Sequence, residues 1–81
     1  MKLQIVMIDW EDIHSPSCGW VDTDEAIRLR PMPCKTVGFL VKMDKNKIIT
    51  AHNNSADGDW NGVEIIPRGC VRRIKKLGSV K

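Results

Sequence analysis

The 81-residue sequence contains no tyrosine, a single phenylalanine and only three cysteines. Three thiols cannot all pair within one chain, so the sequence does not predict a disulfide framework. No apolar run approaches the roughly 20 residues that a transmembrane helix needs. Met1 and Lys2 lead directly into a strand-like segment that contains Gln4 and Asp9, so the sequence predicts no signal peptide. These absences predict a cytoplasmic protein with reduced thiols and no membrane contact.

Acidic residues are absent from one part of the chain, because none follows Glu64. Six of the ten acids lie in the first 25 residues, where Lys2 is the only base. The formal net charge of +3 is therefore unevenly distributed, with a basic C-terminal segment. Two interpretations are open: this segment binds a phosphate, a nucleotide or an acidic partner, or it is a solvated tail beside an acidic face.

Two apolar, β-branched-rich runs at residues 37–43 and 48–51 flank the polar sequence Asp-Lys-Asn-Lys at 44–47. This arrangement predicts a β-hairpin with a tight turn, and a mostly β fold. Gly38 removes a side chain from the first of these strands. We therefore expect either a close backbone approach or a sharp bend at Gly38.

The N-terminal third of the chain predicts a strand, a loop and a short helix. Residues 2–10 alternate with apolar side chains on both faces, as in a strand that is covered on both sides, and residues 11–19 form a loop. Asp22 and Glu25 have the spacing of a helix N-terminal cap, so we expect a helix over residues 23–29 that ends before Pro31. A helix this short needs packing, so Ile27 or Ala26 is expected to lie on the sheet.

The remaining segments complete a small barrel. Residues 52–62 form a polar loop around Trp60, residues 63–66 and 70–74 form strands, and Pro67-Arg68-Gly69 form a tight turn. The sequence therefore predicts a five-stranded SH3-like or Sm-like small barrel with one short helix inserted after the first strand. It forms one domain over residues 1–77, and residues 78–81 form a frayed basic tail. A small core and a doubly apolar first strand predict a homo-oligomer.

Several short motifs resemble a known group of proteins. They are Trp-Glu-Asp at 10–12, Gly-Trp at 19–20, Thr-Val-Gly-Phe-Leu-Val at 36–41, Ile-Ile-Thr-Ala-His at 48–52, Ile-Ile-Pro-Arg-Gly at 65–69 and Val-Arg-Arg-Ile at 71–74. In this order they resemble small proteins of tailed bacteriophages and prophages. The last motifs are also similar to the final two strands of Sm-like proteins. The phage resemblance implies an accessory protein in the cytoplasm of the infected bacterium, which acts in counter-defence or host takeover by binding.

Two tryptophans beside polar loops suggest what such a protein would bind. An indole next to flexible polar residues can stack on a nucleobase, and an arginine can hold a phosphate. The leading hypothesis is a protein that sequesters a small ligand, with a nucleotide signalling molecule as the ligand. The alternative role for these indoles is to fold back over a small core. The candidate ligand-binding residues are Trp20, His52, Asn53, Asn54, Ser55, Trp60 and Arg68.

The competing hypothesis is an adaptor or inhibitor that binds nucleic acid or a host protein through the basic segment. Its candidate nucleic-acid-binding residues are Arg72, Arg73, Lys75 and Lys76. We expect no enzyme, because no motif places an orienting carboxylate or an oxyanion hole beside Cys18 and a histidine. No metal or cofactor is expected either, since His14 and Cys18 form only one ligand-like pair.

Overall fold

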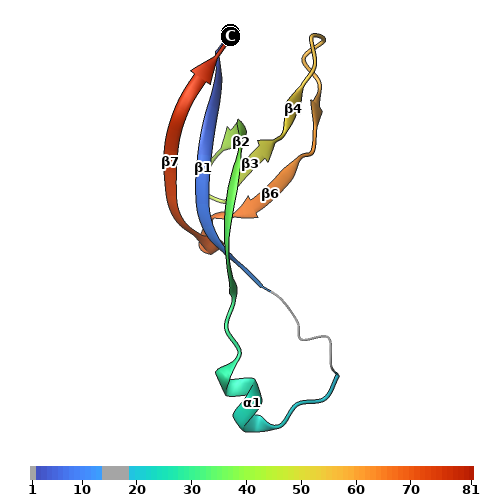
Figure 1. The fold of residues 1–81 in the computed structure, drawn as a ribbon, viewed down its shortest axis with the longest axis vertical. Helices are drawn as coiled ribbons and strands as arrows, with labels where there is room; N and C mark the ends of the chain where they lie inside the picture. Colours follow the sequence, from blue (N-terminus) through green and yellow to red (C-terminus); the bar gives the residue numbers. More distant parts are fainter. Residues whose placement is uncertain (1, 14–18) are drawn as a thin grey trace.

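The computed structural model describes residues 2–13 and 19–81. These residues form a mostly β structure, a five-stranded antiparallel sheet with one short helix after the first strand (Figure 1). In chain order the elements are β1 (Leu3–Asp12), α1 (Thr23–Arg28), β2 (Met32–Met43), β3 (Lys47–Ala51), β4 (Asn53–Asn54), β5 (Trp60–Asn61), β6 (Glu64–Pro67), the 3₁₀ turn η1 (Arg68–Cys70) and β7 (Val71–Val80).

The strands of the main sheet lie in the order β6-β3-β2-β1-β7. All neighbouring pairs are antiparallel, and β1 is flanked by β2 on one side and by β7 on the other. The prediction of a mostly β fold with a helix after the first strand is confirmed. Closure into a barrel is not seen, because no ladder joins β6 to β7 in the part of the chain that the structure describes.

The predicted central hairpin is formed by β2 and β3. At its turn the Asp44 carboxylate accepts hydrogen bonds from the backbone N–H groups of Asn46 and Lys47, at 2.8 and 2.9 Å. These bonds lower the pKa of Asp44, the contact with Asn46 most of all. The strand β2, the first of this hairpin, begins at Met32, five residues earlier than predicted. Its start pairs with the end of β1 at Asp12.

Gly38 marks a close backbone approach, as predicted. A Cβ atom at this position would lie 2.8 Å from the carbonyl oxygen of Ala51 on β3. Real side chains do not tolerate such a distance, and the opposing atom belongs to the backbone. The missing side chain therefore lets the backbone of β3 approach the backbone of β2 closely at this point.

The core lies on the concave face of the curled sheet. Val6 and Ile8 of β1 meet Ile48 of β3 and Ile66 of β6, and all four are buried. Partly buried apolar side chains, Trp10 among them, pack against this cluster. A core this small leaves much of the apolar surface of the chain outside it.

The helix α1 forms where it was predicted but does not pack on the sheet. The Asp22 carboxylate accepts a hydrogen bond from the Glu25 backbone N–H at 2.8 Å, which caps the first turn. The expectation that Ile27 or Ala26 lies on the sheet is wrong: the Ile27 side chain is 76% exposed, and no residue of α1 is buried. Figure 1 shows α1 at the end of an extension that leads away from the sheet. In the described residues, no helix has the length and apolar character to cross a membrane.

Two other expectations about loops and ends need correction. The polar loop at residues 52–62 contains its own two-stranded ladder, in which Asn53 pairs with Asn61 and Asn54 with Trp60. Residues 78–80, which were expected to belong to a frayed tail, are part of β7 instead. This strand continues to Val80, which pairs with Leu3. The doubly apolar first strand thus sits between two long partners.

Candidate functional site

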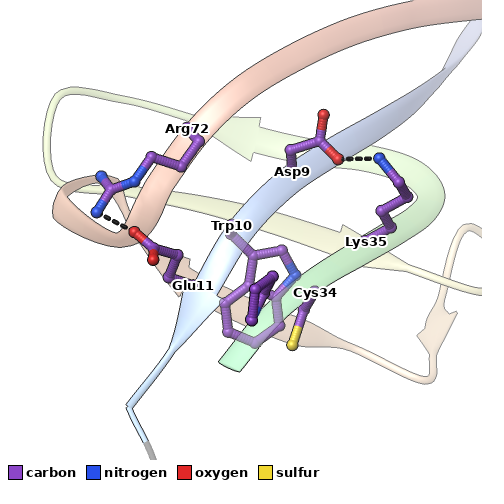
Figure 2. Close-up of a pocket in the computed structure, with 7 residues that line it drawn as sticks. Asp9, Trp10, Glu11, Cys34, Lys35 and Arg72 are labelled. Atoms are coloured by element: carbon purple, nitrogen blue, oxygen red, sulfur yellow. Dashed lines mark hydrogen bonds and ion pairs between the residues drawn. The ribbon is translucent and has the colours of Figure 1, made fainter. Parts of the chain in front are cut away.

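A pocket of about 430 Å³ lies where the extension that carries α1 leaves the sheet. We call it the arm-root pocket. It is formed by the end of β1, the start of β2 and the start of β7 (Figure 2). Its lining residues are Asp9, Trp10, Glu11, Pro33, Cys34, Lys35 and Arg72.

The strand register brings these side chains together. Along the β1–β2 ladder Asp9 is opposite Lys35 and Trp10 is opposite Cys34. The ladder between β1 and β7 shifts register between Asp9 and Trp10. At this irregularity Arg72 makes an ion pair with Glu11 (Figure 2). Residues from three strands thus line one pocket.

Ion pairs surround the rim of the arm-root pocket. Asp9 pairs with Lys35 on one side and, at 3.1 Å, with the Nε atom of Arg73 on the other. The Lys35 hydrogen bond is the main reason that the pKa of Asp9 lies below its ordinary value. Lys35 and Arg72 keep about two-thirds of their side-chain surface exposed, so these pairs are open to solvent. Such exposed pairs are weak, and an anionic ligand can compete for the two cations.

One wall of the pocket is apolar and held in place by hydrogen bonds. The Trp10 indole Nε1 donates to the Thr36 hydroxyl at 2.9 Å, and that hydroxyl donates to the Glu64 carboxylate at 2.8 Å. Trp10 is partly buried against the core cluster, and the free thiol of Cys34 lies beside it. A pocket lined by a fixed tryptophan and by exposed cations can hold a planar ring and an anionic group together.

The amide-rich residues predicted to bind a ligand lie in the β4–β5 hairpin, where they bond to one another. The Asn53 side-chain amide donates to the Asn61 side chain and the Asn54 amide to the Asp59 carbonyl, each at 3.2 Å. The Ser55 hydroxyl accepts from the Asp59 N–H at 3.0 Å. These groups hold the hairpin in shape, which leaves fewer of them free for a ligand.

The two predicted stacking residues have different surroundings. Trp60 packs against Phe39, with their ring centroids 6.3 Å apart. Trp20 is fully exposed in the segment before α1. Figure 1 shows α1 and the β4–β5 hairpin at opposite ends of the molecule. One chain therefore does not bring Trp20 and Trp60 into a common site.

The other two predicted ligand-binding residues contribute backbone contacts. The His52 N–H donates to the Asn61 carbonyl at 3.1 Å, which closes the base of the β4–β5 hairpin. The Arg68 N–H donates to the Asn46 carbonyl at 3.0 Å, which ties η1 to the β2–β3 turn. Both side chains are exposed.

The predicted basic residues all lie on β7, but half of their charge is already paired. Arg72 pairs with Glu11, and Arg73 pairs with Asp9. Lys75 and Lys76 are exposed and form no ion pair with a carboxylate among the described residues. The unpaired positive charge on β7 is therefore smaller than the sequence suggests.

Within residues 2–13 and 19–81, no three histidine, cysteine or acidic side chains cluster as a metal site would require. His14 and Cys18, the one ligand-like pair in the sequence, lie outside the described residues.

Sequence reasoning missed most of the arm-root pocket. Trp10, Cys34 and Lys35 were not among the candidate ligand-binding residues predicted from the sequence. Their meeting depends on the β1–β2 register, which no local pattern in the sequence specifies.

Comparisons with protein-family models, with curated proteins and with solved structures found no match. Function is therefore inferred from the residues of this chain.

Proposed function

We propose that this chain is a non-catalytic binding protein, and that it takes a small planar, anionic ligand of the nucleotide class in the arm-root pocket. One observation carries the proposal: Trp10 and the exposed cations Lys35 and Arg72 line one pocket of about 430 Å³. Ligand sites in proteins typically have volumes of about 300–1,000 Å³. The ligand class is the one that the sequence predicted, but the proposed site is the arm-root pocket and not the loops around Trp20 and Trp60.

The pocket offers two complementary kinds of contact. Trp10 and Pro33 supply an apolar wall for a base, and stacking on an aromatic side chain is worth roughly 1–3 kcal/mol per base. A phosphate would replace the Glu11 carboxylate at Arg72, whose guanidinium fork suits bidentate binding of phosphate oxygens. Lys35 supplies a second positive charge at the same rim.

The order of the main sheet and the 3₁₀ turn before β7 support an SH3-like or Sm-like relationship, in which β6 and β7 would form the open seam. An accessory role in counter-defence or host takeover, in the cytoplasm of an infected bacterium, is supported by the resemblance of the sequence motifs to phage proteins. Sequestration without chemical conversion of the ligand agrees with this role.

Isothermal titration calorimetry with cyclic and adenine-containing nucleotides tests the proposal. We expect binding by the native chain and at least about a tenfold loss of affinity in Arg72→Ala, because the phosphate contact disappears. Lys45→Ala, which removes a cation at the β2–β3 turn, is the matched control and should bind normally. Absence of heat across the panel would overturn the proposal, and so would a loss of binding in Trp60→Ala without any loss in Arg72→Ala, which would place the ligand at the β4–β5 hairpin.

A further inference from the structure

The extension that carries α1 exposes an unusual amount of apolar surface. We call its described residues, 12–13 and 19–32, the arm. Its helix has six residues and buries none of them, although isolated helices shorter than about 12 residues are marginal in water. The arm therefore needs a covering surface. Its exposed apolar side chains are Ile13, Trp20, Ile27, Leu29 and Met32.

A second apolar surface lies on the convex side of the main sheet, opposite the core. We call it the sheet face. Strand alternation places on it Ile5 and Met7 of β1, Val37 and Phe39 of β2, Ile49 of β3 and Ile65 of β6. Val37 is 50% exposed and Ile65 is 61% exposed. The convex side of a sheet that faced only water would instead carry polar side chains.

The arm cannot cover the sheet face of its own chain in this structure, because it points away from the sheet (Figure 1). The molecule measures 52 × 22 × 19 Å. Its radius of gyration is 16.1 Å, whereas a compact chain of this length has about 12 Å. The two apolar surfaces remain separate within one copy.

The accessible surface is correspondingly large. It amounts to 6283 Å², whereas a compact monomer of this size exposes about 4,900 Å². The difference of about 1,400 Å² exceeds the roughly 800 Å² that each partner buries in a standard protein interface. One interface of ordinary size would therefore remove only part of this excess, and a partner that covers both apolar surfaces would remove more of it.

The charges beside the two surfaces are complementary. The arm carries the exposed acids Asp22, Asp24 and Glu25 at the start of α1. Lys75 on β7 is exposed beside the sheet face and has no acidic partner among the described residues, whereas Lys76 pairs with Val6 and belongs to the opposite face. Lys75 is next to Met7 across the β1–β7 ladder. An acidic arm thus matches a basic sheet edge of the same sequence.

We infer that two copies of this chain exchange arms, so that the arm of each copy lies on the sheet face of the other. Ile27 and its apolar neighbours on the arm cover Met7 and Val37 of the second copy, while the acids of α1 lie beside Lys75. Each chain carries both complementary surfaces, so a twofold arrangement satisfies both contacts and closes the assembly. This inference is independent of the nucleotide proposal and of the arm-root pocket.

The test uses the full-length chain in sedimentation equilibrium and native mass spectrometry. We expect a dimer for the native protein. We expect at least about a tenfold weaker dimer for Ile27→Asp, which changes the arm, and for Val37→Lys, which changes the sheet face. Both side chains are exposed in the single copy, so circular dichroism should show unchanged folding. Lys45→Glu, a charge reversal outside both surfaces, is the control and should dimerise normally.

Mixing the two variants gives a result specific to arm exchange. A dimer of Ile27→Asp with itself has two damaged contacts, and so does a dimer of Val37→Lys with itself. The mixed dimer keeps one contact with a native arm on a native sheet face, so the mixture should form heterodimers more readily than either variant forms homodimers.

Three outcomes would overturn the inference: a native protein that is monomeric at all concentrations, a dimer that both substitutions leave intact, or an open series of larger species. If either variant unfolds, Leu29→Asp or Ile65→Lys replaces it, since both native side chains are exposed.

Discussion

The hydroxyl of Thr36 donates a 2.8 Å hydrogen bond to the carboxylate of Glu64, across the concave side of the sheet. The two residues belong to β2 and β6, which are not neighbours because β3 lies between them. The same hydroxyl accepts the indole N–H of Trp10. A single side chain thus connects three strands and fixes one wall of the arm-root pocket.

Replacing Thr36 with valine should destabilise the fold by about 1–3 kcal/mol, because two partly buried polar groups lose their partner while the shape of the side chain is kept. Urea denaturation measures this loss as a lower midpoint. Thr36→Ser keeps the hydroxyl and is the control, which should lie close to the native protein. Equal destabilisation by serine and valine would contradict a role for the hydrogen bonds and would indicate that the methyl group matters instead.

Gly38→Ala should also be destabilising, for a steric reason. The new Cβ atom would lie 2.8 Å from the Ala51 carbonyl oxygen, and two paired strands would have to separate to accommodate it. We expect a cost of about 1–3 kcal/mol in thermal or urea unfolding, as for other overpacked sites. Gly78→Ala is a matched strand control with no atom within 4 Å of its added Cβ atom, and it should be nearly neutral.

The sequence predicted those elements whose signals are local. The β2–β3 hairpin follows from two apolar runs around Asp44, whose carboxylate binds the turn backbone. The cap at Asp22 follows from its spacing to Glu25. The close approach at Gly38 follows from a missing side chain inside a strand. In each case a few neighbouring residues contain the physical cause.

The features that the sequence did not predict depend on distant partners. Ile27 was expected on the sheet because short helices need packing, but the direction of the arm depends on how far β1 and β2 pair beyond the core. The arm-root pocket depends on the same register, which brings Trp10 next to Cys34. No local pattern specifies how far two strands continue to pair.

The ion pair between Asp9 and Lys35 predicts a pH effect. Hydrogen bonding to Lys35 keeps the pKa of Asp9 below its ordinary value of 3.8 in the folded chain. Folding therefore gains stability from the ionised carboxylate above about pH 4, and this gain is lost as the pH falls from there through the lowered pKa of the folded state. The Asp44 carboxylate, whose pKa is lowered by the turn N–H groups, acts in the same direction.

Lys35→Met should raise the pKa of Asp9 toward its ordinary value, as measured by the side-chain carbon shift in NMR titration. Unfolding midpoints at pH 7 and pH 3 should then differ less than they do in the native protein. Lys45→Met removes a lysine without a carboxylate partner in the described part of the chain and should leave the titration of Asp9 unchanged. An unchanged pKa in Lys35→Met would contradict the assigned cause.

Asp22→Ala should loosen α1 without lowering the stability of the sheet. The substitution removes the bond to the Glu25 N–H, and losing such a cap costs about 0.5–2 kcal/mol of helix stability. Because α1 buries no residue in the single copy, its loss is a local event. Backbone amide exchange measured by NMR should therefore accelerate at Ala26, whose N–H bonds to the Asp22 carbonyl, while the amides of β1 keep their protection.

Asp22→Asn retains a capping oxygen and is the control, with exchange close to that of the native chain. Faster exchange at both Ala26 and the β1 amides would show that the arm packs on the sheet of its own chain. At concentrations where the proposed dimer forms, the arm is covered by the other copy, so the native Ala26 amide should become slower to exchange as the protein concentration rises. The amides of β1 should change less, because pairing with β2 and β7 already protects them in the single copy.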